Sequence, residues 1–146
     1  MIKDEKSTTS PAVMACLEKI YQSEISGINR YLHYSFMIMG YNRIPIQKWF
    51  RDQAQECMDH SIAIGEKITS LGGHPPMVSA KVEETNIHSV DQILQESLTS
   101  EEVALKLYKE LAHLAGDDIA LEEMARQFVR LETEHIDEVK KMLKHK

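Results

Sequence analysis

Hydrophobic and polar positions along most of this chain recur at the three- and four-residue steps of amphipathic α-helices. We expect helices over about 11–39, 45–71, 89–115 and 119–143. No stretch alternates with the two-residue period of a half-buried strand. The pattern therefore predicts an all-α fold of four long helices.

Local signals at the helix ends support these limits. A serine followed by proline is typical of a helix start, and so is a serine three residues before a glutamine. Glycine pairs and proline end helices. The chain carries such signals at Ser10-Pro11, Pro45, Gly72-Gly73, Ser89-Gln92 and Gly116-Asp118.

The connections between the helices indicate how the helices are arranged. The first and third are short, which favours antiparallel neighbours, whereas 73–88 spans 16 residues. Sixteen extended residues reach about 50 Å, and a helix of this size is about 40 Å long. The middle connection can therefore cross the bundle and leave the second and third helices parallel. We expect a flexible tail over 1–10 and one four-helix domain over 11–146.

Composition narrows the range of functions. The net charge of −6 argues against a nucleic-acid surface. Two cysteines without a Cys-x-x-Cys motif give neither a zinc ribbon nor a disulfide framework. The N-terminus lacks the apolar region of a signal peptide, and no apolar run approaches a membrane span. We expect a cytoplasmic protein with no nucleic-acid or membrane partner.

Polar residues interrupt the inner face of each predicted helix. Glu132 and His135 lie three apart on the apolar face of the last helix, so both point inward. Glu24 and Glu101 each have only apolar and tyrosine side chains as helical neighbours. Buried carboxylates and imidazoles need a charged or hydrogen-bonding partner, and a metal ion is one such partner.

The chain also contains an internal repeat. Glu24-x-x-Gly27-x-x-x-Tyr31 resembles Glu101-x-x-Ala104-x-x-x-Tyr108, and a histidine follows in the next helix each time. His60 comes 36 residues after Glu24, and His135 comes 34 residues after Glu101. Two such hairpins placed face to face bring these groups to one level of the core. Glutamates and histidines in this arrangement are typical of di-iron and di-manganese sites in four-helix bundles.

These segments resemble the bacterioferritin family, within the ferritin-like superfamily, from about residue 15 to residue 143. The resemblance rests on 24–31, on Cys57-Met-Asp-His60, on 71–75, on the Glu101 helix and on Glu132-Thr-Glu-His135-Ile-Asp137. It implies a ferritin-like bundle that oxidises ferrous iron with oxygen or peroxide and stores or detoxifies iron. The implied metal ligands are Glu24, His60, Glu101, Glu132 and His135, with Tyr31 beside the metals.

The second helix departs from the family pattern. The family has Glu-x-x-His where this chain has Cys57-x-x-His60, so the bridging carboxylate is absent. Glu56 is a candidate replacement, but one residue turns it about 100° around the helix, towards Gln53 and Asp59. We expect Glu56 to reach the metals only if the helix is locally adjusted, for example by a π-bulge. Cys57 is either a thiolate ligand or, more commonly, a small apolar core residue.

Two further features bear on assembly. Met58 matches the family's haem-ligating methionine, and Ala54, Met58, Ile62 and Gly65 form a second apolar stripe. That stripe predicts an interface in a homo-oligomer, with or without haem. The family's short fifth helix has no counterpart before Lys146, so a different cage, a smaller oligomer and a dimer remain open.

Whether the protein is an enzyme depends on the departure at Cys57. The leading hypothesis is a ferroxidase and iron store. The alternatives are a metal- or haem-binding homo-oligomer that does not oxidise iron and a small di-iron oxidase or peroxidase. A DNA-protecting mini-ferritin is less consistent with an acidic chain whose ligands converge within one bundle.

Overall fold

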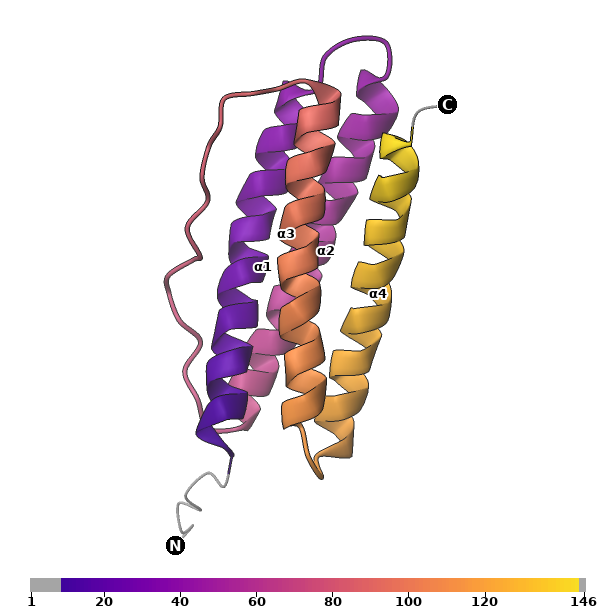
Figure 1. Ribbon diagram of the computed structural model, residues 1–146. Coiled ribbons are helices and arrows are strands. Elements are labelled where there is room, and N and C mark those ends of the chain that lie inside the picture. The colour runs from indigo at the N-terminus through magenta and orange to yellow at the C-terminus, as the bar shows by residue number, and fades with distance from the viewer. Residues whose placement is uncertain (1–8, 145–146) are drawn as a thin grey trace, which may run out of the picture.

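The computed structural model describes residues 9–144, which form a bundle of four long helices (Figure 1). The helices are α1 (Pro11–Met37), α2 (Arg43–Ser70), α3 (Val90–Leu114) and α4 (Ile119–Leu143). The predicted all-α four-helix fold is therefore confirmed. None of these helices is long and apolar enough to cross a membrane.

Side-chain caps fix three of the four helix starts. Ser10, Ser89 and Asp118 each accept a hydrogen bond from a backbone N–H of the following turn, which satisfies a group that has no partner within the helix. α2 begins at Arg43, two residues before the predicted start. Pro45 lies in its first turn, where a missing N–H breaks no helical hydrogen bond. Most of the predicted tail, residues 1–8, lies outside the described residues.

The connection between α2 and α3 runs beside α1 from one end of the bundle to the other (Figure 1). In its middle, the backbone N–H of Ala80 donates to the carbonyl of Gln22 in α1, at 3.2 Å. This crossover, residues 71–89, leaves α2 and α3 parallel and makes α1–α2 and α3–α4 antiparallel hairpins, as predicted.

The bundle core consists of two apolar clusters. One lies towards the α1 N-terminus and contains Leu17, Ile64, Leu111 and Phe128, among others. The other lies towards the α1 C-terminus and contains Phe50, Leu94, Ile136 and Val139, among others. The buried glutamates and histidine come from helix positions between these clusters. They form a polar layer that apolar side chains enclose from above and below along the bundle axis.

The cap of α4 gives a direct test of how this fold is stabilised. The Asp118 carboxylate accepts the N–H of Leu121 at 3.0 Å. We expect Asp118→Ala to lower the free energy of unfolding by about 1 kcal/mol, because that N–H loses its partner. The melting temperature should fall by about 2–4 °C, measured by circular dichroism. Asp117→Ala, at the exposed neighbouring position, is the control, and an equal loss there would contradict the capping role.

Candidate metal centre

Each of the four helices contributes to one polar level at the centre of the bundle. α1 provides Glu24, α2 provides His60, α3 provides Glu101, and α4 provides Glu132 and His135. The first four are buried, and the His135 side chain is 14% exposed. All five sequence-predicted ligand candidates of the inner faces therefore come together.

Their ligand atoms form two groups that share one residue. Glu24, His60 and Glu132 make one group, and Glu101, Glu132 and His135 make the other. Within each group, one ligand atom per residue lies within 4.8 Å of the others. His60 Nδ1 lies 3.8 Å from Glu24 Oε2, and His135 Nδ1 lies 3.9 Å from Glu132 Oε1. Glu132 thus stands between two adjacent positions for a cation.

Two buried tyrosines cross the bundle to hold the glutamates of the repeat. The Tyr31 hydroxyl of α1 donates to Glu101 Oε1 of α3 at 3.0 Å, and the Tyr108 hydroxyl of α3 donates to Glu24 of α1. The Tyr31 position beside the site agrees with the sequence prediction. The matching role of Tyr108 was missed, although its place in the repeat was a signal for it. Each pair fixes one carboxylate by a hydrogen bond, which orients a ligand.

The carboxylates of this level cannot all be ionised without a compensating charge. Burial raises the pKa of Glu132 to about 9, and repulsion from Glu24, Glu101 and Glu56 adds to the effect. Burial also raises the pKa of Glu101 to about 7, despite the hydrogen bond from Tyr31. The metal-free centre therefore binds protons at pH values where exposed glutamates are ionised, and a cation could replace those protons.

Glu56 reaches this level without any change in the helix, so the predicted need for a local adjustment is wrong. α2 is regular α-helix throughout, yet Glu56 Oε2 lies 2.8 Å from His135 Nε2, and its Oε1 lies 3.7 Å from His60 Nε2. The Cβ of Glu56 does not point at the polar level, but the long side chain is able to bring the carboxylate there. Gln53, which was expected on the outer side, is buried as well. Glu56 therefore places a carboxylate between the two histidines.

Glu56 and His135 each stabilise the charged form of the other. Burial opposes the ionised form of each group, but the hydrogen bond between them outweighs it. The pKa of Glu56 is consequently lowered and that of His135 raised. A metal ion bound by His135 would have to displace a proton from this pair.

Cys57 lies beside the ligands as a neutral thiol. Burial, followed by the nearby Glu24 carboxylate, raises its pKa far above the ordinary value, so a thiolate is disfavoured. The thiol packs against α1 where Gly27 has no side chain, since a Cβ at that position would lie 2.8 Å from the Cys57 sulfur. The core-packing interpretation of Cys57 fits this environment better than the ligand interpretation.

The residues present fit one or two divalent cations. Among the described residues, the buried polar side-chain atoms without a hydrogen-bond partner include His60 Nδ1, Glu101 Oε2 and Glu132 Oε2. Unsatisfied buried groups of this kind are destabilising unless a ligand meets them. The cavity that these residues line measures about 20 Å³, which is about the room that one water molecule needs. The free space therefore admits a cation or a molecule of about the size of water, but no organic substrate.

Met58 lies apart from this centre, on the outer surface of α2. It is 42% exposed, and Ile62 one turn later is 57% exposed. The predicted outer stripe is wrong at Ala54, which is buried in the core, and Gly65 packs against the ring of Tyr21. The apolar outer face of α2 is therefore smaller than predicted, and the haem role of Met58 stays a prediction.

Comparison with solved structures gives matches across nearly the whole chain. A ferritin-like di-iron-carboxylate protein of Bacillus anthracis superimposes with a TM-score of 0.86 at 23% identity, covering 93% of this chain and 100% of its own. The Rhodobacter capsulatus bacterioferritin, described with a metal-free dinuclear site and a haem iron, gives 0.83 at 23%, covering 93% and 86%. A dodecameric thioferritin from Bacteroides fragilis gives 0.83 at 21%, covering 90% and 83%.

At these low sequence identities, the structural matches establish a shared fold and no more. No curated protein sequence gives a significant match. The family model of the ferritin-like domain, by contrast, matches residues 14–145, which is nearly all of the chain. The chain therefore belongs to the ferritin-like family.

Proposed function

We propose that this protein is bacterioferritin-like and binds ferrous iron in pairs at the candidate metal centre, where oxygen or peroxide oxidises it for storage or detoxification. The observation that carries the proposal is the pair of ligand groups that share Glu132. Oxygen and imidazole ligands suit iron, and a shared carboxylate places two ions side by side. The bacterioferritin and the di-iron-carboxylate protein among the structural matches support the same assignment.

In this proposal Glu24 and His60 bind one ferrous ion, Glu101 and His135 bind the other, and Glu132 bridges them. Glu56 takes the place of the carboxylate missing at Cys57, because it already stands between both histidines. Two ferrous ions, one oxygen molecule and two protons give two ferric ions and one hydrogen peroxide. The ligand carboxylates favour the ferric product by their charge, and Tyr31 and Tyr108 hold two of them in place.

The small cavity argues against the closest alternative function, a di-iron oxidase or peroxidase for organic substrates. A di-iron oxidase or peroxidase acting on an organic substrate needs a pocket beside the metals. Ligand pockets for such molecules usually measure several hundred Å³, whereas about 20 Å³ is free here. Each ferrous ion would lie among its own ligand atoms, so this function needs no pocket of that size.

Assembly is part of the proposal. Relatives of this fold include a dodecamer, and the exposed Met58 and Ile62 provide an apolar contact for another copy. We propose a homo-oligomer, at least a dimer, in which this face of α2 is buried.

Iron oxidation is the first test of the proposal. Ferrous iron added in air to metal-free protein should be oxidised well above the buffer rate, saturating at about two irons per chain, as followed by near-ultraviolet absorbance. Glu132→Ala should abolish the fast phase because both ions lose a ligand. Glu134→Ala, at an exposed position of the same helix, should keep it. Oxidation at the buffer rate in the unaltered protein would refute a ferroxidase and leave a metal-binding role.

The two neighbours on α2 can be told apart in the same assay. We expect Glu56→Ala to slow oxidation at least tenfold, by about 1.4 kcal/mol or more in activation free energy, because the carboxylate between the histidines is lost. Cys57→Ala should retain most of the rate. The opposite result, a Cys57→Ala variant that fails while Glu56→Ala works, would identify the sulfur as the ligand.

The raised pKa of Glu132 predicts how the stability of the metal-free protein depends on pH. The folded protein keeps the proton until about pH 9, whereas the unfolded chain loses it near its ordinary value of 4.5. The stability contribution of this group therefore falls as the pH rises through that interval. At pH 8, about 3.5 pH units above the ordinary pKa, this contribution costs up to about 5 kcal/mol. The isosteric, uncharged Glu132→Gln should therefore be more stable by several kcal/mol, about 10 °C or more in melting temperature.

That difference should shrink towards zero as the pH falls to about 4.5, where both proteins are neutral at this position. Thermal unfolding with a chelator present measures it. Adding a divalent metal should reverse the order, because the metal binds the ionised glutamate. Equal stability of the two proteins at pH 8 would contradict the buried, repelled carboxylate.

A further inference from the structure

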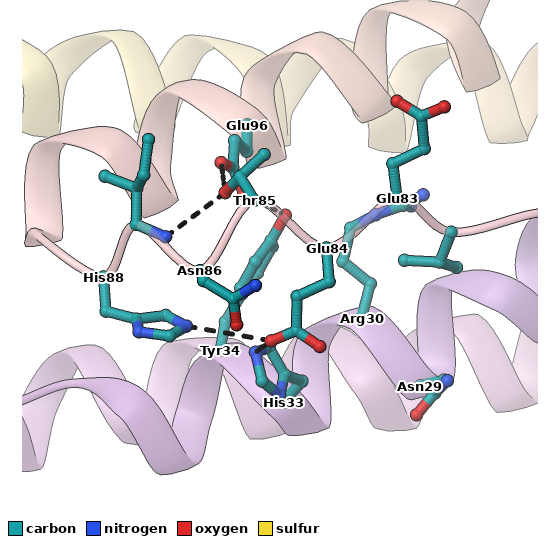
Figure 2. A pocket seen from close by; sticks show the side chains of 12 residues that line it. Asn29, Arg30, His33, Tyr34, Glu83, Glu84, Thr85, Asn86, His88 and Glu96 are labelled. Carbon is teal, nitrogen blue, oxygen red and sulfur yellow. Dashed lines mark hydrogen bonds and ion pairs between the residues drawn. The ribbon is translucent and has the colours of Figure 1, made fainter.

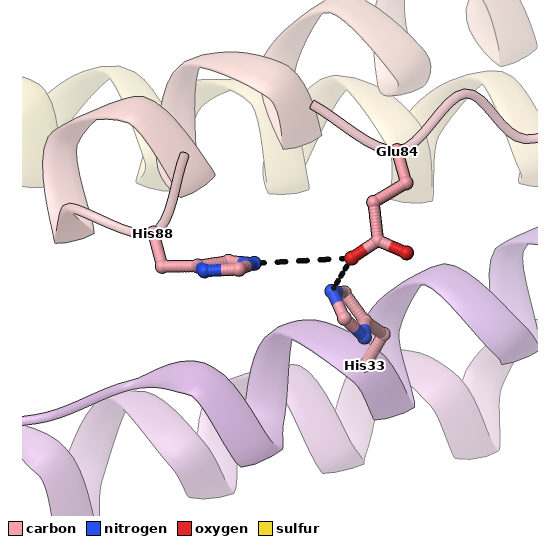
Figure 3. A group of neighbouring side chains, drawn as sticks. All are labelled: His33, Glu84 and His88. Carbon is pink, nitrogen blue, oxygen red and sulfur yellow. Dashed lines mark ion pairs between the residues drawn. The ribbon is translucent and has the colours of Figure 1, made fainter. Parts of the chain in front are cut away.

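A second group of metal-ligand side chains lies outside the candidate metal centre, where the crossover passes α1. It consists of His33 on α1 and of Glu84 and His88 on the crossover (Figure 3). His33 Nε2 lies 3.0 Å from Glu84 Oε1, and His88 Nε2 lies 3.9 Å from the same oxygen. None of these residues contributes to the polar level of the core.

The geometry points to a binding site for a divalent transition-metal ion at these three residues, which fastens the crossover to α1. Each side chain offers a ligand atom within 4.8 Å of the other two. Ligands about 2.0–2.1 Å from a tetrahedral zinc ion lie about 3.3 Å from one another. The two distances above bracket that value, so small side-chain rotations suffice. Two imidazoles and a carboxylate are ligands for zinc and related ions, with a position left for water.

The crossover residues are held in place by contacts beyond the cluster. Asn86, between the two crossover ligands, has a φ of 56°. Asparagine tolerates this left-handed conformation better than most residues. Thr85 donates to Glu96 of α3 at 2.5 Å, and Tyr34 of α1 donates to the other oxygen of Glu96 at 3.0 Å (Figure 2). Glu96 of α3 thereby links this part of the crossover to α3 and α1. A site built this way needs little reorganisation on binding.

The surroundings suit a small hydrated cation. The three residues lie in a pocket of about 180 Å³ whose charged lining includes Glu83, Glu84, Glu96 and Arg30 (Figure 2). Partial burial opposes ionisation of Glu96, but hydrogen bonds from Thr85, Gln92 and Tyr34 outweigh it and lower its pKa. The lining thus has three carboxylates and one arginine, which favours a cation. Glu83 also forms an ion pair with Lys81, at 4.0 Å. The side chains of His33 and Glu84 are 38% and 53% exposed, so an ion can enter from solvent.

Zinc binding to the whole protein tests this site. Equilibrium dialysis with metal analysis should give one zinc per chain fewer in His33→Gln and in His88→Gln than in the unaltered protein, or at least tenfold weaker binding of that zinc. His74→Gln, at an exposed position of the same crossover, should match the unaltered protein. All these proteins share the inner centre, so the differences report the outer site alone.

A second readout follows the crossover itself. Lys81, three residues before Glu84, is 86% exposed and offers a cleavage point for trypsin. Zinc at ten times its dissociation constant should slow cleavage there about tenfold if cleavage requires the crossover to open. The effect should be absent in His33→Gln and His88→Gln but present in His74→Gln.

One result would overturn the inference. If all four proteins bind the same amount of zinc with the same affinity, the cluster is only a carboxylate ion-paired with two imidazoles. Neither readout depends on iron oxidation, so the outer site can fail while the ferroxidase stands, and the reverse. Circular dichroism of each variant verifies that the bundle is intact.

Discussion

The rest of this structure depends on the burial of carboxylates at the middle of the bundle. Glu24, Glu101 and Glu132 are almost fully enclosed between two apolar clusters. An apolar core of the same volume would be more stable for folding alone, because removing carboxylates from water costs several kcal/mol each unless they are paired. Protons offset part of that cost in the metal-free protein, as the raised pKa of Glu132 shows. Folding stability alone therefore does not account for this arrangement, whereas the proposed binding of metal ions does.

The crossover brings the two helix hairpins, and the glutamates that they carry, together with near two-fold symmetry. Because it carries the chain along the full length of the bundle, α3 and α4 repeat the antiparallel arrangement of α1 and α2 on the opposite side (Figure 1). Each half supplies a glutamate and a tyrosine seven residues later, and each tyrosine donates to the glutamate of the other half. The repeat in the sequence thus becomes a pair of reciprocal hydrogen bonds that orient one carboxylate in each proposed cation position.

The sequence predicted the helices, their order and five inward-facing candidate ligands, because helical periodicity fixes which positions share a face. It failed where side-chain length matters more than phase. Glu56 was placed on the outer side by its Cβ direction, yet its carboxylate reaches both histidines. The group of His33, Glu84 and His88 was not predictable either. Two of its members lie in a segment without periodicity, and their position depends on the irregular path of the crossover along α1.

Cys57 and Glu56 are best understood together. α1 and α2 approach closely at this level, since the Cys57 sulfur occupies the space that a Gly27 side chain would need. The cavity beyond it is about 20 Å³, which is too little for a second long side chain beside the existing carboxylates. A glutamate at position 57 would crowd this space, whereas Glu56 enters from the more open side of α2 and remains 27% exposed. In the proposed centre, α2 supplies its carboxylate from Glu56, one residue before Cys57. The small thiol of Cys57 fills the gap between the two helices.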